Sequence, residues 1–291
     1  MTIEDPSLSV EETDSATLIS GLGELHIEVT LDRLYREFGL EVVTGPPSVA
    51  YRETITETIE TNGLVEYDRT IGGTRLQGAV DLMLVPNLCQ ESIDMDSSCM
   101  LLSEPVVTVS SNVRDYLGLD PDMPEDELMF RSDVVKALVQ GCRGALKRGP
   151  IKSYEMASVR CIINEIDAEG GLPVLKSLPG SIRAAAAHAV SHSLQNGHEN
   201  LGRCTVLEPT MSVEVTLPTD MVGSVLSDIT GRRGAVGDVL INDEGSSHSK
   251  ALIRGDVPLV EILGYANSLR SLTGGEGAFS AEYKGHSACS V

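Results

Sequence analysis

The sequence predicts an α+β protein built from separate units, and three observations support this. Residues 203–291 run in the order strand, helix, strand, strand, helix, strand, which is the split βαβ or ferredoxin-like arrangement. Residues 17–45 repeat the second half of such a unit, and residues 46–202 mix strands with two longer helical patterns. An apolar content of 41% is enough for folded cores, and aliphatic side chains must fill most of them because Trp is absent.

The C-terminal unit, 204–291, has the clearest periodicity. Its first strand alternates and is β-branched, and the helix after it places Met221, Val222, Val225, Leu226 and Ile229 on one face. Thr219 or Asp220 can cap that helix. The expected elements are a strand at 205–218, a helix at 219–231, a hairpin at 235–245 and 249–258, a helix at 258–275 and a strand at 277–285. Together they predict a complete ferredoxin-like βαββαβ domain.

The N-terminal segment, 1–46, reads as a truncated unit of the same kind. A short strand at 17–21 precedes a helix at 23–39, which Gly39 ends, and a further strand is expected at 40–45. The first strand and first helix of the unit are missing, so its core would be open at one end. We therefore expect that the chain starts inside a domain.

The middle unit, 47–203, reads as a separate α+β region. Strands are expected at 49–59, 76–86 and 156–166, with helices at about 131–147 and 180–196. Residues 90–128 hold ten acidic residues and one arginine. This composition indicates an acidic, largely solvated lobe around one strand at 104–111.

The chain is strongly acidic, with 43 acidic residues against 22 basic ones and a net charge of −21. This charge argues against loose binding to nucleic acid but allows a local basic patch. Six scattered cysteines without a CxxC pattern favour free thiols in a reducing compartment. No apolar run is long enough to span a membrane, and the acidic start resembles neither a signal nor a transit peptide.

Two adjacent arginines, Arg232 and Arg233, stand between glycines at the end of the 219–231 helix. One interpretation is structural, since cations near a helix C-terminus interact favourably with its dipole. The other is contact with a phosphate backbone, which a glycine-flanked turn can approach closely. The residues alone favour neither.

Four further basic residues are candidates for RNA contact. Arg69 and Arg75 flank Gly72-Gly73, which reads as the exposed tip of a hairpin, and the alternative is a solvated turn. Lys176 and Arg183 bracket the Pro-Gly start of the 180–196 helix, where ordinary surface charge is the stronger alternative.

Catalytic and metal-binding patterns are absent from the sequence. The histidines at 188, 192 and 198 and Cys204 lack a zinc-site pattern such as HExxH or paired cysteines, so no metal site is expected. No carboxylate pair or reactive cysteine stands out, and we expect no catalytic residue. Neither a GxxxxGK[ST] phosphate loop nor an NKxD motif occurs, so this chain alone is expected to hold no nucleotide.

Three colinear stretches resemble the C-terminal half of elongation factor G, a translational GTPase. They are residues 4–55, containing "SGLGELHIEVTLDRLYREFGLEVVTGPPSVAYRETI", residues 206–218, "VLEPTMSVEVTLP", and residues 229–275, with "ITGRRG" and "VPLVEILGYANSLRSLTGG". The resemblance implies a third, a fourth and a fifth domain at 1–46, 47–203 and 204–291, the fourth with a ribosomal-protein-like fold. One departure is Glu276, in a turn that is commonly basic in the family.

The resemblance also implies a function. It gives a ribosome-binding part that reaches ribosomal RNA and proteins, with GTP and magnesium held by an N-terminal domain missing from this chain. The tip loop 66–84, "EYDRTIGGTRLQGAVDLML", lacks the RGQYGH pattern of translocases and is similar to the "DRT-(I/L)-G" segment of the mitochondrial ribosome-releasing type. This favours ribosome disassembly with the recycling factor by a monomeric mitochondrial protein.

Two alternatives remain open at this point. One is a translocase of the same family, and the other is a free-standing ribosome-binding adaptor without GTPase activity. A plastid or cytosolic location also remains open, because the mitochondrial assignment rests on the resemblance.

Overall fold

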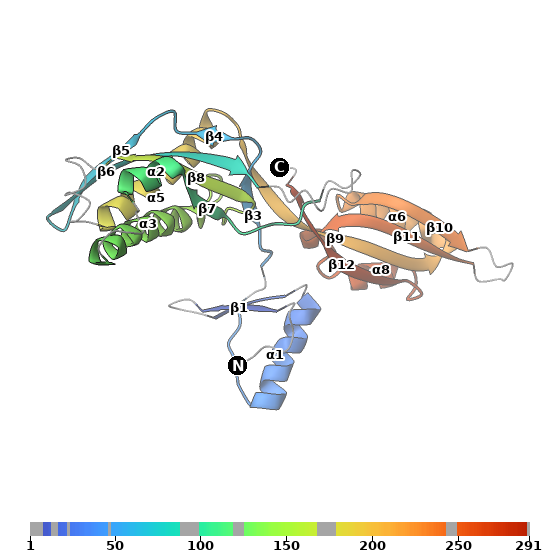
Figure 1. The fold of residues 1–291 in the computed structure, drawn as a ribbon. Coiled ribbons are helices and arrows are strands. Elements are labelled where there is room, and N and C mark those ends of the chain that lie inside the picture. The colour runs from blue at the N-terminus through green and yellow to red at the C-terminus, as the bar shows by residue number, and fades with distance from the viewer. Residues whose placement is uncertain are drawn as a thin grey trace. The chain divides into compact units, whose positions relative to one another are not determined.

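The computed structural model describes residues 8–12, 17–21, 24–45, 48–87, 99–118, 125–167, 179–242 and 249–289. The chain divides into two compact units, one of residues 1–50 with 208–286 and the other of residues 51–207 with 287–291 (Figure 1). Both units combine strands with helices, which confirms the predicted α+β class.

The N-terminal segment is a two-stranded hairpin followed by a helix. Strand β1 (Ser9–Glu12) pairs antiparallel with β2 (Thr17–Ser20), and α1 (Glu24–Phe38) follows. Gly39 ends the helix as expected, with φ +63° and its N–H donating to the Tyr35 carbonyl at 3.0 Å. The strand expected at 40–45 is wrong, because these residues join no ladder among the described residues and a strand needs a neighbour for its backbone groups.

The second unit is built on a mixed sheet. It contains β4 (Ile59–Glu60), β5 (Val65–Ile71), β6 (Thr74–Pro86), β7 (Val106–Val109) and β8 (Val159–Asp167). The order is β4-β6-β8-β7, with β5 also pairing with β6, and only the β7–β8 pairing is parallel among the recorded pairs. The single strand expected at 49–59 is wrong: β3 (Arg52–Ile55) pairs instead with residues 204–207 of β9 (Cys204–Pro218).

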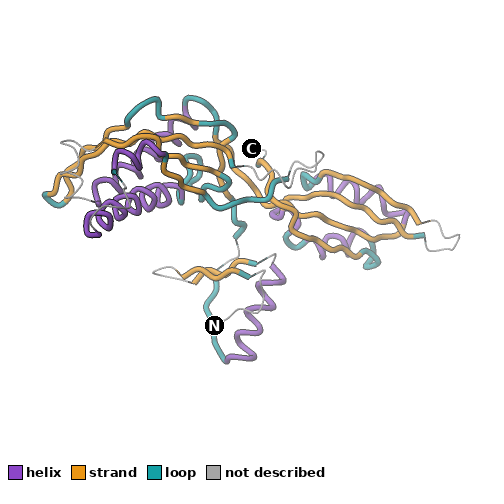
Figure 2. Tube along the Cα trace, in the orientation of Figure 1, coloured by secondary structure: helices purple, strands orange, loops and turns teal. Residues whose placement is uncertain are grey.

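Three helices cover one face of this sheet: α2 (Ser111–Leu117), α3 (Glu125–Leu146) and α5 (Pro179–Glu199) (Figure 2). Gly141 allows the close crossing of α3 and α5, since a Cβ there would overlap the Arg183 carbonyl oxygen. The expectation of a solvated lobe at 90–128 is partly wrong. Within it, α2 buries Val113 and Leu117 in the core, and residues 125–128 begin α3, while 90–98 and 119–124 lie outside the described residues.

The C-terminal elements β9, β10 (Ala235–Asn242), β11 (Lys250–Pro258) and β12 (Ala278–Ala288) lie in a five-stranded sheet in the order β10-β11-β9-β12, and β3 is its fifth strand through its pairing with β9. Numbered along the chain, this order is 2-3-1-4, which confirms the ferredoxin-like arrangement. Helix α6 (Val222–Gly231) and α8 (Tyr265–Leu272) bury their apolar faces against Met211, Val213 and Val215 of β9.

Two local expectations in this sheet domain are wrong. Helix α6 starts only after a 3₁₀ turn, η2 (Thr219–Met221). No side chain caps the start of η2 or the start of α6, so the expected cap by Thr219 or Asp220 is wrong. The helix expected at 258–275 is two helices, α7 (Leu259–Ile262) and α8, because Gly264 takes the left-handed conformation at φ +71°.

Cys142, Cys161 and Cys204 are free thiols, as the spacing predicted, while Cys89 lies outside the described residues. Across the described part of the chain, no helix has the length and apolar character needed to cross a bilayer.

Candidate nucleic-acid interface

Arg232 ends helix α6 and turns its guanidinium inward. Its Nε donates to Asp228 one turn earlier at 2.9 Å, and Nη1 donates to the Glu261 carbonyl at 2.7 Å. Its Cζ lies 4.9 Å from the centre of the Tyr265 ring, within cation–π range. The side chain therefore joins α6, α7 and α8.

Arg233 forms the best-developed ion-pair network in the described residues. Its two terminal nitrogens donate to both oxygens of Glu208 at 2.8 and 3.0 Å, and Nε donates to Glu261 at 3.0 Å. The Glu208 side chain is only 4% exposed, so this bidentate contact neutralises a buried carboxylate. The hydrogen bonds to Glu208, and then those to Glu261, raise the pKa of Arg233 above its ordinary value.

Helix α6 ends at the arginine pair, as the structural interpretation expects, and both side chains also hold neighbouring elements together through ion pairs. The Arg233 side chain keeps 37% of its surface exposed and the Arg232 side chain 24%. Contact of Arg232 and Arg233 with RNA stays a prediction, and any phosphate would have to compete with the carboxylates already bound.

Arg75 lies at the tip of the β5–β6 hairpin, as expected. Gly72 and Gly73 have φ +58° and +82°, the pattern of a two-residue type I′ turn. Arg75 clamps Asp68 with both Nε, at 3.0 Å, and Nη2, at 2.5 Å. The hydrogen bond from Arg75 lowers the pKa of the Asp68 carboxyl. Arg75 is therefore exposed but already paired with a carboxylate.

Arg69 lies on the same strand as Asp68 but on its other face. The structure records no ion pair for it with any described residue, and its Cζ lies 5.9 Å from the centre of the Tyr67 ring. Tyr67 in turn contacts His188 of α5, with ring centres 5.4 Å apart, and His188 lies 6.3 Å from His192. The fold thus brings Tyr67 and Arg69 of β5 together with His188 and His192 of α5.

Tyr67 was missed by sequence reasoning, and His188 and His192 were considered only as metal ligands. The i, i+4 spacing of the two histidines shows that they share a helix face, but the contact of that face with β5 depends on how the helix packs. No group of three or more His, Cys, Asp or Glu residues suited to a metal is found in the described ranges.

Arg183 does not join this cluster. Arg183 is exposed on α5, five residues before His188, which at 3.6 residues per turn turns it about 140° away around the helix. Lys176 lies outside the described residues. RNA contact by either residue stays a prediction.

Glu53 is the most deeply buried carboxylate among the described residues of the second unit, and its role is structural. It accepts hydrogen bonds from the backbone N–H groups of Ile151, Lys152 and Tyr154 at 2.8–3.0 Å. These bonds fix the loop between α3 and β8 and leave no open space beside the carboxylate, because a Cβ at Gly149 would already overlap it. Glu53 is not arranged as an acid or base for a substrate.

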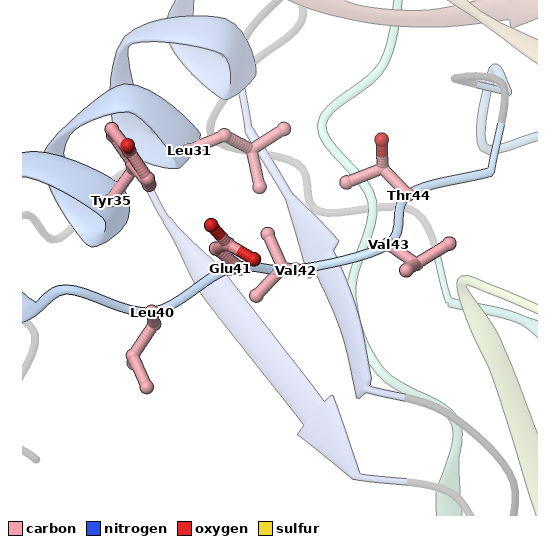
Figure 3. A pocket seen from close by; sticks show the side chains of 7 residues that line it. All are labelled: Leu31, Tyr35, Leu40, Glu41, Val42, Val43 and Thr44. Atoms are coloured by element: carbon pink, nitrogen blue, oxygen red, sulfur yellow. The ribbon is translucent and has the colours of Figure 1, made fainter.

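An open hollow of about 570 Å³ lies between α1 and the segment after it (Figure 3). Its lining is mainly apolar, from Leu31, Tyr35, Leu40, Val42 and Val43, with Glu41 and Thr44. Convergent polar groups of the kind that orient a small-molecule ligand are not seen among these lining residues. The hollow marks unfilled apolar surface of the N-terminal segment.

Comparison with protein families assigns both ends of the chain. Residues 1–46 match the model "Elongation Factor G, domain III", and residues 205–290 match "Elongation factor G C-terminus". Elongation factor G of Alteromonas mediterranea is 31% identical over 98% of this chain. The mitochondrial ribosome-releasing factor 2 of Danio rerio is 32% identical over 96% of it.

A crystal structure of a protein from Thermus thermophilus has a similar fold. It aligns with 98% of this chain at a TM-score of 0.59 and 26% identity. The chain spans about a third of the length of the relatives it matches, 35% and 32% for the two named proteins and 37% for the Thermus thermophilus chain.

Proposed function

This chain is homologous to the C-terminal part of elongation factor G, and from that premise we propose that it is the ribosome-binding part of a translational GTPase. The observation that carries the proposal is the extent of the similarity, which covers 96–98% of the chain in each of two differently named relatives. The ferredoxin-like strand order of the C-terminal sheet lies within the residues that match the family model.

The residues present do not fit a nucleotide. The sequence lacks a phosphate loop, and the arginines best placed to meet phosphate at the α6 terminus are occupied by carboxylates. We propose that GTP and magnesium are held by a domain outside these residues, since the relatives are about three times as long as this chain. Its own contribution is to present folded surfaces, including the exposed β5–β6 hairpin, to the ribosome.

Within this role, we propose ribosome disassembly with the recycling factor in mitochondria. Two observations support it: the "DRTIGG" tip of the β5–β6 hairpin and the similarity to a relative named as a mitochondrial ribosome-releasing factor. The tight type I′ turn gives this hairpin a narrow, exposed end that could be inserted between two surfaces.

The test uses the protein that contains this chain together with a GTP-binding domain. Mitochondrial ribosomes are incubated with it, the recycling factor and GTP, and subunits are separated on a sucrose gradient. Splitting that requires both proteins and GTP supports the proposal. Ribosomes that remain joined would contradict disassembly, although co-sedimentation of the protein with them would leave ribosome binding intact.

Translocation is the second candidate, because several relatives are named elongation factor G. The tip of the β5–β6 hairpin is the part of the chain that distinguishes disassembly from translocation. When residues 66–84 replace the corresponding loop of a translocase, we expect the movement of tRNA to be lost. Reactivity with puromycin measures this movement. Retained translocation by the chimaera would favour the second candidate.

A further inference from the structure

The exposed side of α3 and of the loop after it is basic, in contrast to the acidic chain that carries it. The sequence contains no acidic residue at positions 134–154, although the whole chain has a net charge of −21. The basic residues of this interval are all exposed, and we call them the α3 basic face: Lys136, Arg143, Lys147, Arg148 and Lys152. A surface with cations and no acids favours a partner of the opposite charge.

Most cations of the α3 basic face have no carboxylate bound to them. Lys136 pairs with Asp133 at 2.9 Å, but the structure records no ion pair between the other four and any described residue. The next acid along the chain, Glu155, is paired with Arg52 at 3.4 Å. The arginines at the α6 terminus differ, because carboxylates already hold their guanidiniums. The α3 basic face can therefore bind an anionic group without displacing one.

One helix sets the spacing of these cations. Lys136, Arg143 and Lys147 follow one another at intervals of seven and four residues, so they form one row on the helix surface, about 16 Å long. Gly144 lies next to this row, and a Cβ built there would meet nothing within 4 Å. The row therefore borders open space, into which another backbone can approach closely.

Lys152 extends the face onto a loop whose backbone is fixed. Its N–H donates to the buried Glu53 carboxylate at 2.8 Å, and the Gly149 N–H donates to the Tyr154 carbonyl at 2.6 Å. The Met156 N–H then donates to the carbonyl of Leu146 in α3 at 2.9 Å. These bonds hold the loop against the end of α3, so a partner does not have to order its backbone.

An acidic helix fits this face better than RNA does. Residues 136–148 include no aromatic ring on which a base could stack, and the nearby Tyr154 is half-buried and stacks on Tyr51 with ring centres 5.4 Å apart. Intervals of seven and four residues are instead those at which two helices exchange ion pairs along a shared seam. The acidic residues elsewhere in the chain oppose such a partner little, because charges more than about 8 Å away are largely screened at physiological ionic strength.

We propose that the α3 basic face is a docking surface for an acidic α-helix of a partner protein. Glutamate or aspartate side chains in one row on that helix pair with Arg143 and Lys147, and at its ends with Lys136 and Lys152. A small residue of the partner helix lies over Gly144. This interaction goes beyond the proposed function and does not rest on it.

The experiment measures the fluorescence anisotropy of a labelled peptide mixed with the full chain at about 150 mM salt. The peptide is an alanine-based helix of about 21 residues, long enough to form in water, with glutamates in one row at intervals of four and seven residues. A second peptide of the same composition distributes its glutamates around the helix. We expect the first peptide to bind and the second to bind at least about fivefold more weakly.

The double variant Arg143→Gln, Lys147→Gln tests the cations. Both positions are exposed, so the fold should be unaffected, which circular dichroism checks. We expect binding to weaken at least about fivefold, the combined effect of two exposed ion pairs. The matched control is Arg33→Gln, Arg36→Gln, which removes the same charge from α1, where both guanidiniums already pair with acids of that helix. It should change affinity less than about twofold.

Two further variants test the geometry. Gly144→Leu leaves the charge unchanged but fills the space beside the row, so it should also weaken binding at least about fivefold if a helix packs there. Arg143→Glu with Lys147→Glu should abolish binding of the acidic peptide and create binding of a peptide with lysines in the same row.

Four outcomes would overturn the proposal. They are no binding of the first peptide, equal binding of the two peptides, an equal loss in the α1 control, and displacement of the peptide by oligouridine at lower concentration than by unlabelled peptide. The last would identify RNA as the occupant. Unchanged affinity in Gly144→Leu would also contradict it, because attraction by charge alone does not need a close approach.

Discussion

Arg233 is held in a backbone conformation that side chains other than glycine rarely adopt. Its φ of +59° lies in the left-handed region, which costs an L-residue about 1–2 kcal/mol. Three charge-assisted hydrogen bonds to Glu208 and Glu261 offset this cost. The residue directs its guanidinium toward β9 because that backbone conformation turns the chain back over the end of α6.

Arg233→Met tests this role. It keeps much of the side-chain volume and leaves the backbone strain, but it strands the buried Glu208 carboxylate. We expect a loss of about 2–3 kcal/mol in the free energy of unfolding, below the 3–5 kcal/mol of a fully buried pair because the guanidinium is 37% exposed. Urea unfolding followed by circular dichroism measures it.

Arg254→Met is the control for that measurement. Arg254 pairs with one glutamate, Glu214, and both side chains are about half exposed, so the expected loss is below about 1 kcal/mol. Equal losses in the two variants would contradict a special role for Glu208 burial. Adding Glu208→Gln to Arg233→Met should recover part of the lost stability, since the buried charge is then gone.

His188 makes the second unit sensitive to acid. Its pKa is lowered in the folded state, first by burial, so the folded protein binds a proton less readily than the unfolded chain. The stability that this residue contributes is complete above the ordinary histidine pKa of about 6.5 and is lost as pH falls through the lowered value. His188→Gln should therefore reduce the loss of stability between pH 8 and pH 5. Histidine NMR titration provides the direct check, and a pKa at or above the ordinary value would contradict it.

In the second unit, the close packing of α3 against α5 depends on one residue, Gly141. Gly141 and Gly144 both lie in α3, three residues apart, but only Gly141 faces α5. Gly141→Ala should cost about 1–3 kcal/mol, because its Cβ would overlap the Arg183 carbonyl oxygen and the helices must separate.

Gly144→Ala should act in the opposite direction. An added Cβ there meets nothing within 4 Å, so only the helix propensity changes, and a gain of about 0.5–1 kcal/mol is expected. Thermal unfolding of both variants against the parent protein measures the two shifts. A loss in Gly144→Ala equal to that in Gly141→Ala would show that the helix, and not the crossing, is sensitive.

Element types followed from sequence where a local pattern determined them, and failed where pairing or packing decided. The apolar periodicity of α6 and the glycine pair of the β5–β6 turn depend on local chemistry, and both were predicted. The helix break at Gly264 was missed because glycine inside a periodic run is often tolerated. Residues 40–45 have strand composition, but among the described residues they have no edge to pair with.

The features of the candidate site were also predicted where they depend on local sequence and missed where they depend on packing. Exposure of Arg69 and Arg75 followed from the hairpin pattern, whereas their opposite environments follow from strand alternation and the packing of α5. The ion pairs of Arg233 join residues 25 and 28 positions apart, and nothing in the local sequence indicates which glutamate of an acidic chain will be the partner.

At the scale of the whole molecule, stability is unevenly distributed. The buried hydrophobic residues begin at Ile55 and form one core cluster in each of the two units, while before residue 51 no residue whose side chain the structure describes is buried. In α1, two large apolar side chains, Tyr35 and Phe38, are more than half exposed. A helix of 15 residues without a buried face is marginal in water.

Hydrogen exchange measured by mass spectrometry should reveal this difference. We expect amides of α1 to exchange within seconds to minutes, since opening them exposes little new apolar surface. Amides of α5 and β8, whose side chains form the core of the second unit, should be protected by orders of magnitude more. Protection of α1 comparable to that of α5 would contradict the prediction and would mean that another surface covers Leu31, Tyr35 and Val42 in solution. Phe38→Glu separates the two cases: it should leave exchange unchanged if the face is bare, and accelerate it if the face is covered.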